Sequence, residues 1–552
     1  MAIDLPPVIP PQASTPEKIA EHADTSSTIT VQAPNSAFVF QITGNRYLAE
    51  DKVRQIFTVA NDPSQAVRGL NQAYYQSGHL LVTTYYARQG NTIYVHVVNG
   101  RVADIKGPKS ILNFFDGLVG DEDPTAAEFD KARVLADVKS SRQGVDYRIS
   151  YKLEGDPENF TLIFTESEVA DYESNDLSAY LTNQGNRFVG RYFGGASMTQ
   201  RFSTGTEAVI AWDTAVPEWG ETEGGRSYDA LRVKLDHVTS KGLYGVQASY
   251  VEYERDAEVI SIIPGNPGTV IIPGTPPVGA TPDTIVTSET QLNAEIRTLA
   301  LNGQQILASS PTHRLILSEK LEYVDSEIRT SDGQTILDEP TASFELGARY
   351  TRHMLWWGRS SKLDLQAAIE KGLSSDRGTL GTDDTDGVVS AGARSGDFLT
   401  IQPQMAFKFG LSDNYALNTS LGGQWADTQL PQHYQYVFGG LTKMSAWLPG
   451  VLVGDSGIHA SMSLERAAWD IAGFSITPSL FVEYGQLWYE DASGDAGDKQ
   501  SLSDGGFRLK ASWGEWLESQ IVVAAPLSED VQDEDRVNGV EADFFWHLKT
   551  TL

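Results

Sequence analysis

Short and long connections alternate strictly along the last two thirds of this chain, and this alternation constrains the fold more than any other feature. Beyond Asp171 the helical periodicity stops almost completely, and about 16 segments alternate apolar with polar residues. Tight turns such as 411–413 are followed by long polar connections such as 426–456. A barrel that crosses a membrane has tight turns at one rim and long loops at the other, on strands of about 9–11 residues. Residues 171–552 are therefore predicted to form an all-β transmembrane barrel of about 16 antiparallel strands.

The expected strands suit a membrane span, and one connection among the tight turns is unusual. Residues 302–311 join two strands at the rim of tight turns but are longer than the other turns there. A closed barrel leaves no unpaired strand edge in lipid, so such a protein belongs in an outer membrane. The expected strands are 176–184, 187–202, 206–214, 228–238, 243–255, 287–301, 312–329, 342–353, 361–371, 398–410, 414–425, 457–467, 474–489, 505–513, 516–525 and 537–549.

Composition and charge exclude several classes of protein. The chain has 42 Lys and Arg residues and 73 Asp and Glu residues, and its net charge of −31 repels phosphate backbones, so no nucleic acid partner is expected. The absence of cysteine excludes disulfides and thiolate metal sites. The mean hydropathy of −0.28 is typical of a soluble protein, but the alternating strands of a membrane barrel average to a similar value. The chain opens without the basic start and apolar core of a signal peptide, so we expect a processed chain.

Two related α+β modules are expected before the barrel. Residues 36–106 show a strand, two helical stretches and two further strands, and the same order recurs in degraded form over residues 107–170. One irregular α+β domain is the alternative. Residues 1–35 are rich in proline and then in serine and threonine, and their short helical stretch at 17–23 is a candidate plug for the pore. We expect this segment to gain structure only from a partner.

Several short motifs occur in one order along the chain. They are NQAYYQSGHL at 71–80, VHVVNGRV at 95–102, NQG at 183–185, FGG at 438–440, LVGDSG at 452–457, FVEYG at 481–485 and APL at 525–527. Together with the two modules and the barrel strands, they resemble the two-partner secretion transporters (TpsB type) of the outer-membrane POTRA-barrel superfamily over nearly the whole chain. This resemblance implies that residues 36–106 and 107–170 are POTRA modules in the periplasm.

The resemblance also places the connection 426–456 inside the barrel, where it gates the lumen. In the family the tip of this loop carries an Arg that pairs with an Asp of a strand motif. This chain has Ser445 and Glu483 at those positions, so a bidentate Arg–carboxylate pair cannot form. Lys443 and Lys499 are the candidate substitutes. The resemblance assigns the loop and gating role to Gly439, Gly440, Lys443, Met444, Ser445, Ala446 and Trp447, and the anchor on the barrel wall to Phe481, Glu483 and Gly485.

Recruitment of an exported protein is the role expected of the two modules. An exposed strand edge or a groove between helix and strand accepts an extended polypeptide through main-chain hydrogen bonds. The alternative is that the modules only space the barrel from the periplasm. The candidate client-binding residues are Tyr74, Tyr75, Gly78, Val95 and Val97.

No catalytic motif is found in the sequence. The nine His residues are scattered, and the Gly-Asp-Ser-Gly stretch at 454–457 lies at the entry of a strand rather than before a helix. We therefore expect no enzyme activity, no cofactor and no metal site.

Three functions are weighed against one another. The first is an outer-membrane transporter that recruits a secreted exoprotein through its periplasmic modules and passes it through the barrel pore, with outer-membrane lipid around the barrel. The second is a factor that assembles other outer-membrane barrels. The third is a passive porin, against which the two periplasmic modules argue. Tryptophans near the strand ends are expected to form a girdle at the lipid interface, among them Trp356, Trp357, Trp513 and Trp516.

Overall fold

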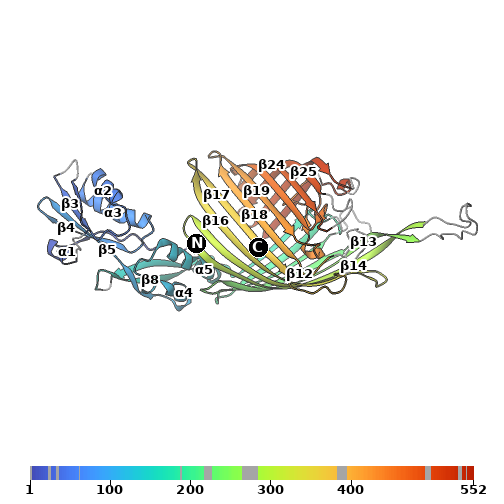
Figure 1. Ribbon diagram of the computed structural model, residues 1–552, viewed down its shortest axis with the longest axis horizontal. Coiled ribbons are helices and arrows are strands. Elements are labelled where there is room, and N and C mark those ends of the chain that lie inside the picture. Colours follow the sequence, from blue (N-terminus) through green and yellow to red (C-terminus); the bar gives the residue numbers. More distant parts are fainter. Residues whose placement is uncertain are drawn as a thin grey trace, which may run out of the picture.

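Two small α+β modules precede a large β-barrel in the computed structural model of this chain, with the second module next to one rim of the barrel and the first module beyond it (Figure 1). A long hairpin of the barrel extends away at the opposite end of the molecule. The structure describes residues 3–22, 27–32, 37–60, 62–153, 155–186, 189–216, 227–263, 284–381, 394–491, 499–532, 537–542 and 544–552. Parts of the predicted long loops fall outside these residues.

The first module has the predicted order of strand, two helices and two strands. Its elements are β3 (Val39–Thr43), α2 (Glu50–Val59), α3 (Pro63–Gln76), β4 (Val82–Gln89) and β5 (Thr92–Asn99). Helix α3 begins where the Asp62 side chain accepts a hydrogen bond from the backbone N–H of Gln65, with Pro63 at the first helical position. The apolar faces of α2 and α3 pack on the sheet through Val53, Phe57 and Leu70.

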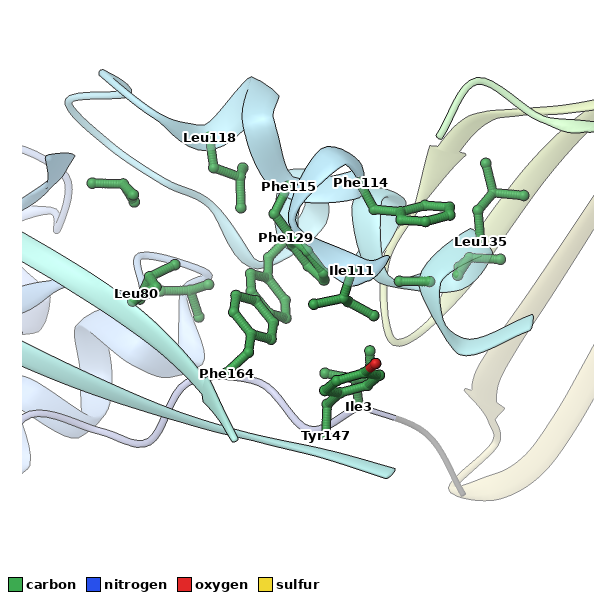
Figure 2. Close-up of a cluster of buried hydrophobic side chains, with 14 of the residues drawn as sticks. Ile3, Leu80, Ile111, Phe114, Phe115, Leu118, Phe129, Leu135, Tyr147 and Phe164 are labelled. Carbon is green, nitrogen blue, oxygen red and sulfur yellow. The ribbon is translucent and has the colours of Figure 1, made fainter. Parts of the chain in front are cut away.

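The second module repeats this order. Its elements are β6 (Arg101–Lys106), α4 (Lys109–Phe115), the 3₁₀ turn η2 (Asp116–Leu118), α5 (Ala126–Gln143), β7 (Val145–Leu153) and β8 (Asn159–Glu168). Helix α5 starts with a reciprocal capping box between Thr125 and Glu128 and stops at Gly144, whose φ of 69° suits a residue without a Cβ. The core brings Phe115, Phe129 and Phe164 together (Figure 2).

The boundary between the modules lies earlier than predicted. Strand β6 pairs in parallel with β8, in a sheet ordered β6-β8-β7, so it belongs to the second module although the predicted boundary at residue 106 assigns it to the first. The prediction failed because the strand follows β5 after one residue, Gly100, and no turn signal marks the change of sheet. No helix among the described residues is long and apolar enough to cross a membrane.

The N-terminal segment, residues 3–32, lies on the two modules, which corrects the prediction that it is unstructured or plugs the pore. It contains β1 (Gln12–Ala13), α1 (Pro16–His22) and β2 (Ile29–Gln32). Strands β1 and β2 complete a five-stranded sheet of order β1-β4-β5-β3-β2. Ile3 is buried in the core of the second module with Ile111 and Tyr147 (Figure 2). Isolated apolar residues such as Ile3 and Ile9 give no periodic signal, so the sequence did not reveal this docking.

The barrel is closed and antiparallel, and it contains sixteen strands in the described residues, as predicted. Its twelfth strand is interrupted, since β22 and β23 both pair with β24. Leu231, Val233 and Leu235 are exposed on the outside of the barrel, as the alternation predicts. The strands are β9 (Asn175–Thr182), β10 (Phe193–Arg201), β11 (Thr206–Ala215), β12 (Ser227–Val238), β13 (Leu243–Ile263), β14 (Thr284–Ser309), β15 (His313–Thr330), β16 (Thr335–Trp356), β17 (Arg359–Gly372), β18 (Leu399–Gly410), β19 (Tyr415–Ala426), β22 (Ser456–Arg466), β23 (Trp469–Ile471), β24 (Phe474–Trp488), β25 (Gln500–Trp513), β26 (Leu517–Asp530) and β27 (Phe544–Thr551).

Two predictions for the barrel differ from the structure, at residues 302–311 and at the start of the last strand. The connection expected to be unusually long at 302–311 is a short turn at 310–312, because β14 continues to Ser309 and is paired with β15 up to that residue. Strands β13 and β14 pair with each other beyond their neighbours and form the long hairpin of Figure 1. The last strand begins at Phe544 rather than at residue 537, because residues 537–542 fold into the barrel and contact the loop described below.

Candidate functional site

The loop between β19 and β22, residues 426–456, folds back into the barrel, and we call it the lumen loop. Its two ends meet as the short strands β20 (Tyr436–Val437) and β21 (Val453–Gly454). Phe438, Met444 and Trp447 of the loop share one buried cluster with side chains of the barrel wall. Wall residue Phe481 is buried against them, whereas its neighbour Leu480 is exposed on the outside. The lumen loop therefore packs against the inner face of β24 and the strands beside it.

The loop tip is anchored by its own backbone rather than by a basic side chain. The backbone N–H of Ser445 donates to Oε2 of Glu483 at 2.8 Å, and that of Ala446 donates to Oδ2 of Asp504 at 2.7 Å. Met444 has a φ of 66°, which turns the chain so that these two successive N–H groups point at the wall. Hydrogen bonds from N–H groups to carboxylates are stronger than those between neutral groups.

Neither of the two lysines considered as a substitute for the missing Arg contacts this anchor. Lys443 Nζ lies 3.8 Å from the ring centroid of Tyr436, and Lys499 Nζ lies 4.6 Å from that of Trp488. Backbone donors carry no residue signature, so the anchor of the loop tip could not be recognised from the sequence.

The positive charge near the anchor comes from the barrel wall. Arg508 on β25 places Nη2 3.9 Å from Oε1 of Glu483 and 3.2 Å from the carbonyl oxygen of Leu441, and its guanidinium lies 4.8 Å from the ring centroid of Phe481. Asp504 and Glu483 are both buried, and buried carboxylates are tolerated only with hydrogen-bond partners or a neighbouring cation. Asp504 and Arg508 are thus site residues that the sequence analysis missed.

Gly485 is required by a close approach between wall and loop. A Cβ atom at this position would lie 2.6 Å from Cζ of Phe438 and 3.2 Å from Cε of Met444. The three predicted anchor residues Phe481, Glu483 and Gly485 therefore all face the lumen loop. Each contributes differently: an aromatic surface, an acceptor for the tip and room for the Phe438 ring.

A second segment covers the tip of the lumen loop. The backbone N–H of Leu448 donates to the carbonyl of Val540 at 3.0 Å, and the N–H of Ala542 donates to the carbonyl of Ala446 at 2.8 Å. Val537 and Ala542 join the cluster around Trp447, which is fully buried. The apolar alternation of residues 537–542 predicted a strand, and the structure shows that the same apolar residues pack on the loop instead.

The base of the lumen loop is fixed by Asp455. This buried carboxylate accepts hydrogen bonds from the backbone N–H groups of Leu430 at 2.9 Å and Glu490 at 3.0 Å. The amide of Gln424 on β19 donates to the carbonyl oxygens of Tyr434 and Asp455. Base and tip are therefore held at separate points of the wall.

The predicted client-binding residues of the first module do not form an accessible surface. Tyr74, Val95 and Val97 are buried in its core. The Tyr75 hydroxyl donates to the carbonyl oxygen of Pro6 at 2.9 Å, and the carbonyl of Gly78 accepts the backbone N–H of Ala126 at 2.7 Å. In this conformation these residues build the module and connect it to its neighbours, so a binding surface must be sought elsewhere on it.

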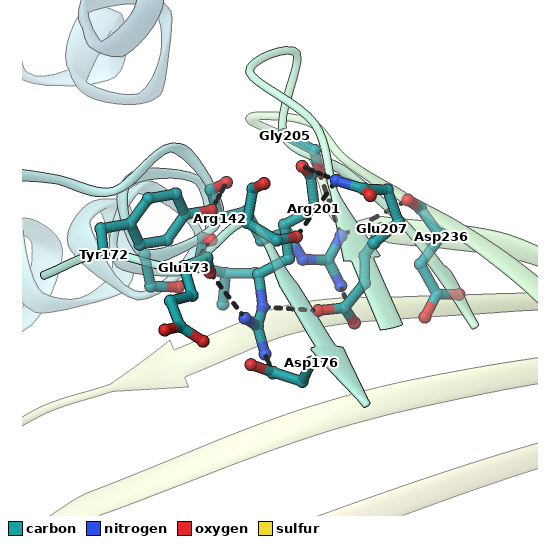
Figure 3. Close-up of polar contacts among 12 residues, drawn as sticks. Arg142, Tyr172, Glu173, Asp176, Arg201, Gly205, Glu207 and Asp236 are labelled. Atoms are coloured by element: carbon teal, nitrogen blue, oxygen red, sulfur yellow. Dashed lines mark hydrogen bonds and ion pairs between the residues drawn. The ribbon is translucent and has the colours of Figure 1, made fainter. Parts of the chain in front are cut away.

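The second module is fixed to the barrel rim by a buried arginine. Arg142 near the end of α5 donates through Nη1 to the carbonyl oxygens of Gly205 at 3.1 Å and Asp236 at 3.4 Å, and its Nη2 lies 3.2 Å from Oε1 of Glu207 (Figure 3). Tyr172 donates from its hydroxyl to the carbonyl of Arg142 at 2.5 Å. These contacts join the module to the tight turns of the barrel.

Comparison with known proteins agrees with this architecture. Residues 285–505 match the family model of the haemolysin secretion/activation proteins ShlB/FhaC/HecB. CdiB from Escherichia coli is 13% identical with a TM-score of 0.67, covering 97% of this chain and 95% of that protein. CdiB from Acinetobacter baumannii is 13% identical with a TM-score of 0.58, covering 99% and 94%. A search of the curated proteins found no match. The resemblance to two-partner secretion transporters is confirmed, and so is the placement of the barrel in the outer membrane with the two modules in the periplasm.

Proposed function

Because the barrel of this chain is that of an outer-membrane transporter of the two-partner secretion type, we propose that it recruits one extended exoprotein in the periplasm and passes it through its pore. The observation that carries the proposal is the lumen loop, whose tip is held in the barrel by hydrogen bonds to Glu483 and Asp504 and by packing of Trp447. These contacts are non-covalent and can be exchanged for contacts with a passing polypeptide. The loop is the gate in this proposal.

The position of the modules supports transfer of a bound polypeptide from the modules to the pore. Arg142 holds the second module on the rim of tight turns, so a polypeptide bound to the modules is delivered at the periplasmic mouth of the barrel. The exoprotein is the expected partner, and outer-membrane lipid is the expected surrounding of the barrel. Trp356 and Trp357 contact each other at one tight turn, and Trp513 and Trp516 at another, all exposed as a lipid-interface girdle requires.

The proposal is tested by comparing the proteins that cells export with and without this chain. We expect one or a few large exoproteins to disappear from the culture medium while the outer-membrane proteins remain at their normal levels. Loss of many outer-membrane proteins instead would contradict export and indicate assembly of other barrels. A purified protein with a high and steady conductance in planar bilayers would contradict the gate and indicate a passive porin.

A variant pair links the gate to the pore. Replacing both Glu483 and Asp504 by Ala removes the acceptors of the loop tip, so we expect larger and more frequent conductance steps than in the native protein. Replacing Glu465, which lies on β22 and whose side chain accepts from Lys408, by Ala is the matched control inside the barrel. Equal conductance of the native protein and the double variant would show that the loop tip does not gate the pore.

A further inference from the structure

Both edges of the sheet in the first module are covered by the N-terminal segment of the same chain. Strand β1 lies parallel to β4, with Gln12 opposite Tyr85 and Ala13 opposite Tyr86, and the backbone N–H of Ser14 donates to the carbonyl of Tyr86 at 2.9 Å. Strand β2 pairs with β3 at the other edge. The edge strand β4 therefore already binds an extended segment by strand addition, in a register that the structure gives directly.

The part of the segment before β1 is firmly anchored. Ile3 and Ile9 are only 2% and 3% exposed. The Asn71 amide donates to the carbonyl of Ile9 at 2.6 Å, Tyr75 donates to that of Pro6 at 2.9 Å, and the backbone N–H of Ile3 donates to Oδ1 of Asp137 at 2.7 Å. Residues 3–9 thus stay in place if the following residues leave the sheet.

The part from β1 to α1, residues 12–22, is held more weakly, and we call it the latch. Both residues of β1 are exposed, and Ile19 is the buried residue among the described side chains of α1. Helix α1 has seven residues, and a helix of this length is not stable by itself. A cavity of about 460 Å³ lies beneath α1, lined by Ile19, Tyr85 and His96 of the first module region and by Leu153 and Pro157 of the second module. The latch is therefore bound loosely between anchored ends.

We propose that the latch is an internal competitor: it occupies the β4 edge, on which an extended segment of the exported protein is expected to dock, until that segment displaces it. This inference rests on the proposed function for the identity of the partner. Recognition is by the main-chain groups of β4, which can pair with varied sequences. The sequence of the latch, QASTPEKIAEH at residues 12–22, has Ile19 as its one large apolar residue. The cavity reaches the second module, so a displacing segment continues from β4 towards the end of β7.

The test uses a fluorescein-labelled synthetic peptide with the sequence of residues 8–22 and the full-length protein in detergent, with binding followed by fluorescence anisotropy. Ser14→Pro removes the N–H that donates to Tyr86 and so weakens the latch of the protein. We expect this variant to bind the peptide at least tenfold more tightly than the native protein does. Ser14→Ala, which keeps the N–H, is the matched control and should bind like the native protein.

A covalent lock gives a second and independent readout. The chain has no cysteine, so Ala13→Cys combined with Tyr86→Cys introduces one possible disulfide, across the register of β1 and β4. Oxidised protein should not bind the peptide, and reduction should restore native binding. If Ser14→Pro binds the peptide with the affinity of the native protein, or if the oxidised protein binds the peptide, the latch does not cover the docking site and the proposal is wrong. Peptide binding does not depend on export, so a chain that binds the peptide but exports no protein contradicts the proposed function alone.

Discussion

The lumen loop and the N-terminal segment are both parts of the chain that fold back onto other parts, but they are held by different forces. The tip of the loop is fully buried, its backbone N–H groups pair with two carboxylates of the wall, and Trp447 fills the cluster around it. The latch pairs with β4 through a two-residue strand and is exposed along it. In our two proposals, each segment closes a binding surface of the protein.

This difference indicates how easily each segment leaves its place. Releasing the loop tip uncovers buried carboxylates and an aromatic side chain, which is costly without a replacement. Releasing the latch uncovers one strand edge and Ile19, and water or an incoming strand replaces those contacts. We therefore expect the periplasmic site to open first and the pore to open only when a polypeptide enters it.

The strongest test of the comparison is Trp447→Ala. Truncation of a fully buried tryptophan lowers stability by about 3–5 kcal/mol, so the loop tip should detach from the barrel wall more often. We expect a higher conductance in planar bilayers and faster cleavage of the loop by added protease. Trp357, which is 81% exposed, is the control, and Trp357→Ala should change neither readout. If both variants behave alike, the loop is not held by its buried cluster.

The next largest effect is expected for Arg142→Ala at the base of the second module. In Arg142→Ala the carbonyls of Gly205 and Asp236 lose their charged donor, whereas Glu207 keeps its ion pair with Arg201, so we expect a cost of about 2–3 kcal/mol. Limited proteolysis should then cut between the modules and the barrel at a higher rate. Arg142→Lys should recover only part of the protection, since one ammonium group cannot reproduce the fork of contacts.

Arg148, which is exposed on β7, is the control for this junction, and Arg148→Ala should leave proteolysis unchanged. Equal protection in Arg142→Ala and the native protein would mean that other contacts fix the modules, and the hand-over at the barrel mouth would lose its support.

A smaller effect is expected for Glu483. In Glu483→Ala the backbone N–H of Ser445 loses its acceptor inside the barrel, and an unsatisfied buried donor costs about 1–3 kcal/mol. Glu483→Gln keeps an oxygen acceptor and should be closer to the native protein. Conductance measured for the three proteins should rise in the order native, Gln, Ala. Equal conductance of the two variants, both above that of the native protein, would show that the charge next to Arg508, and not the hydrogen bond, holds the tip.

The smallest effect concerns the anchor of the N-terminal segment and depends on pH. Burial raises the pKa of Asp137 to about 6, although the N–H of Ile3 and the nearby Arg133 guanidinium act in the opposite direction. A carboxyl whose folded pKa is raised binds more protons in the folded state, so its ionisation destabilises the fold as the pH rises from about 4 through 6.

Asp137→Asn keeps the acceptor for Ile3 and removes the charge. We expect this variant to unfold at a higher temperature than the native protein at pH 7.5, and the difference to shrink as the pH falls below 6 and vanish below about 4. Differential scanning calorimetry at three pH values measures this. A difference that does not depend on pH would assign the effect to packing.

Much of this molecule follows from local patterns in the sequence. The alternation along Leu231, Val233 and Leu235, repeated in sixteen segments, predicted the barrel because the period of a strand is two residues and one face meets lipid. The helical spacing of residues 50–77 predicted α2 and α3 of the first module for the corresponding reason. The lumen loop and its wall motif followed from resemblance, and the structure brings Phe481, Glu483 and Gly485 to that loop.

The remaining parts of the site depend on contacts between residues far apart in the chain. Asp504 accepts from Ala446 across 58 positions, and Ile3 donates to Asp137 across 134. The donors are backbone N–H groups, which every residue except proline has, so no sequence pattern marks them. Local periodicity therefore determined the strands and helices. Only the tertiary structure decided which backbone N–H groups hold the lumen loop, where the N-terminal segment binds and to which sheet β6 belongs.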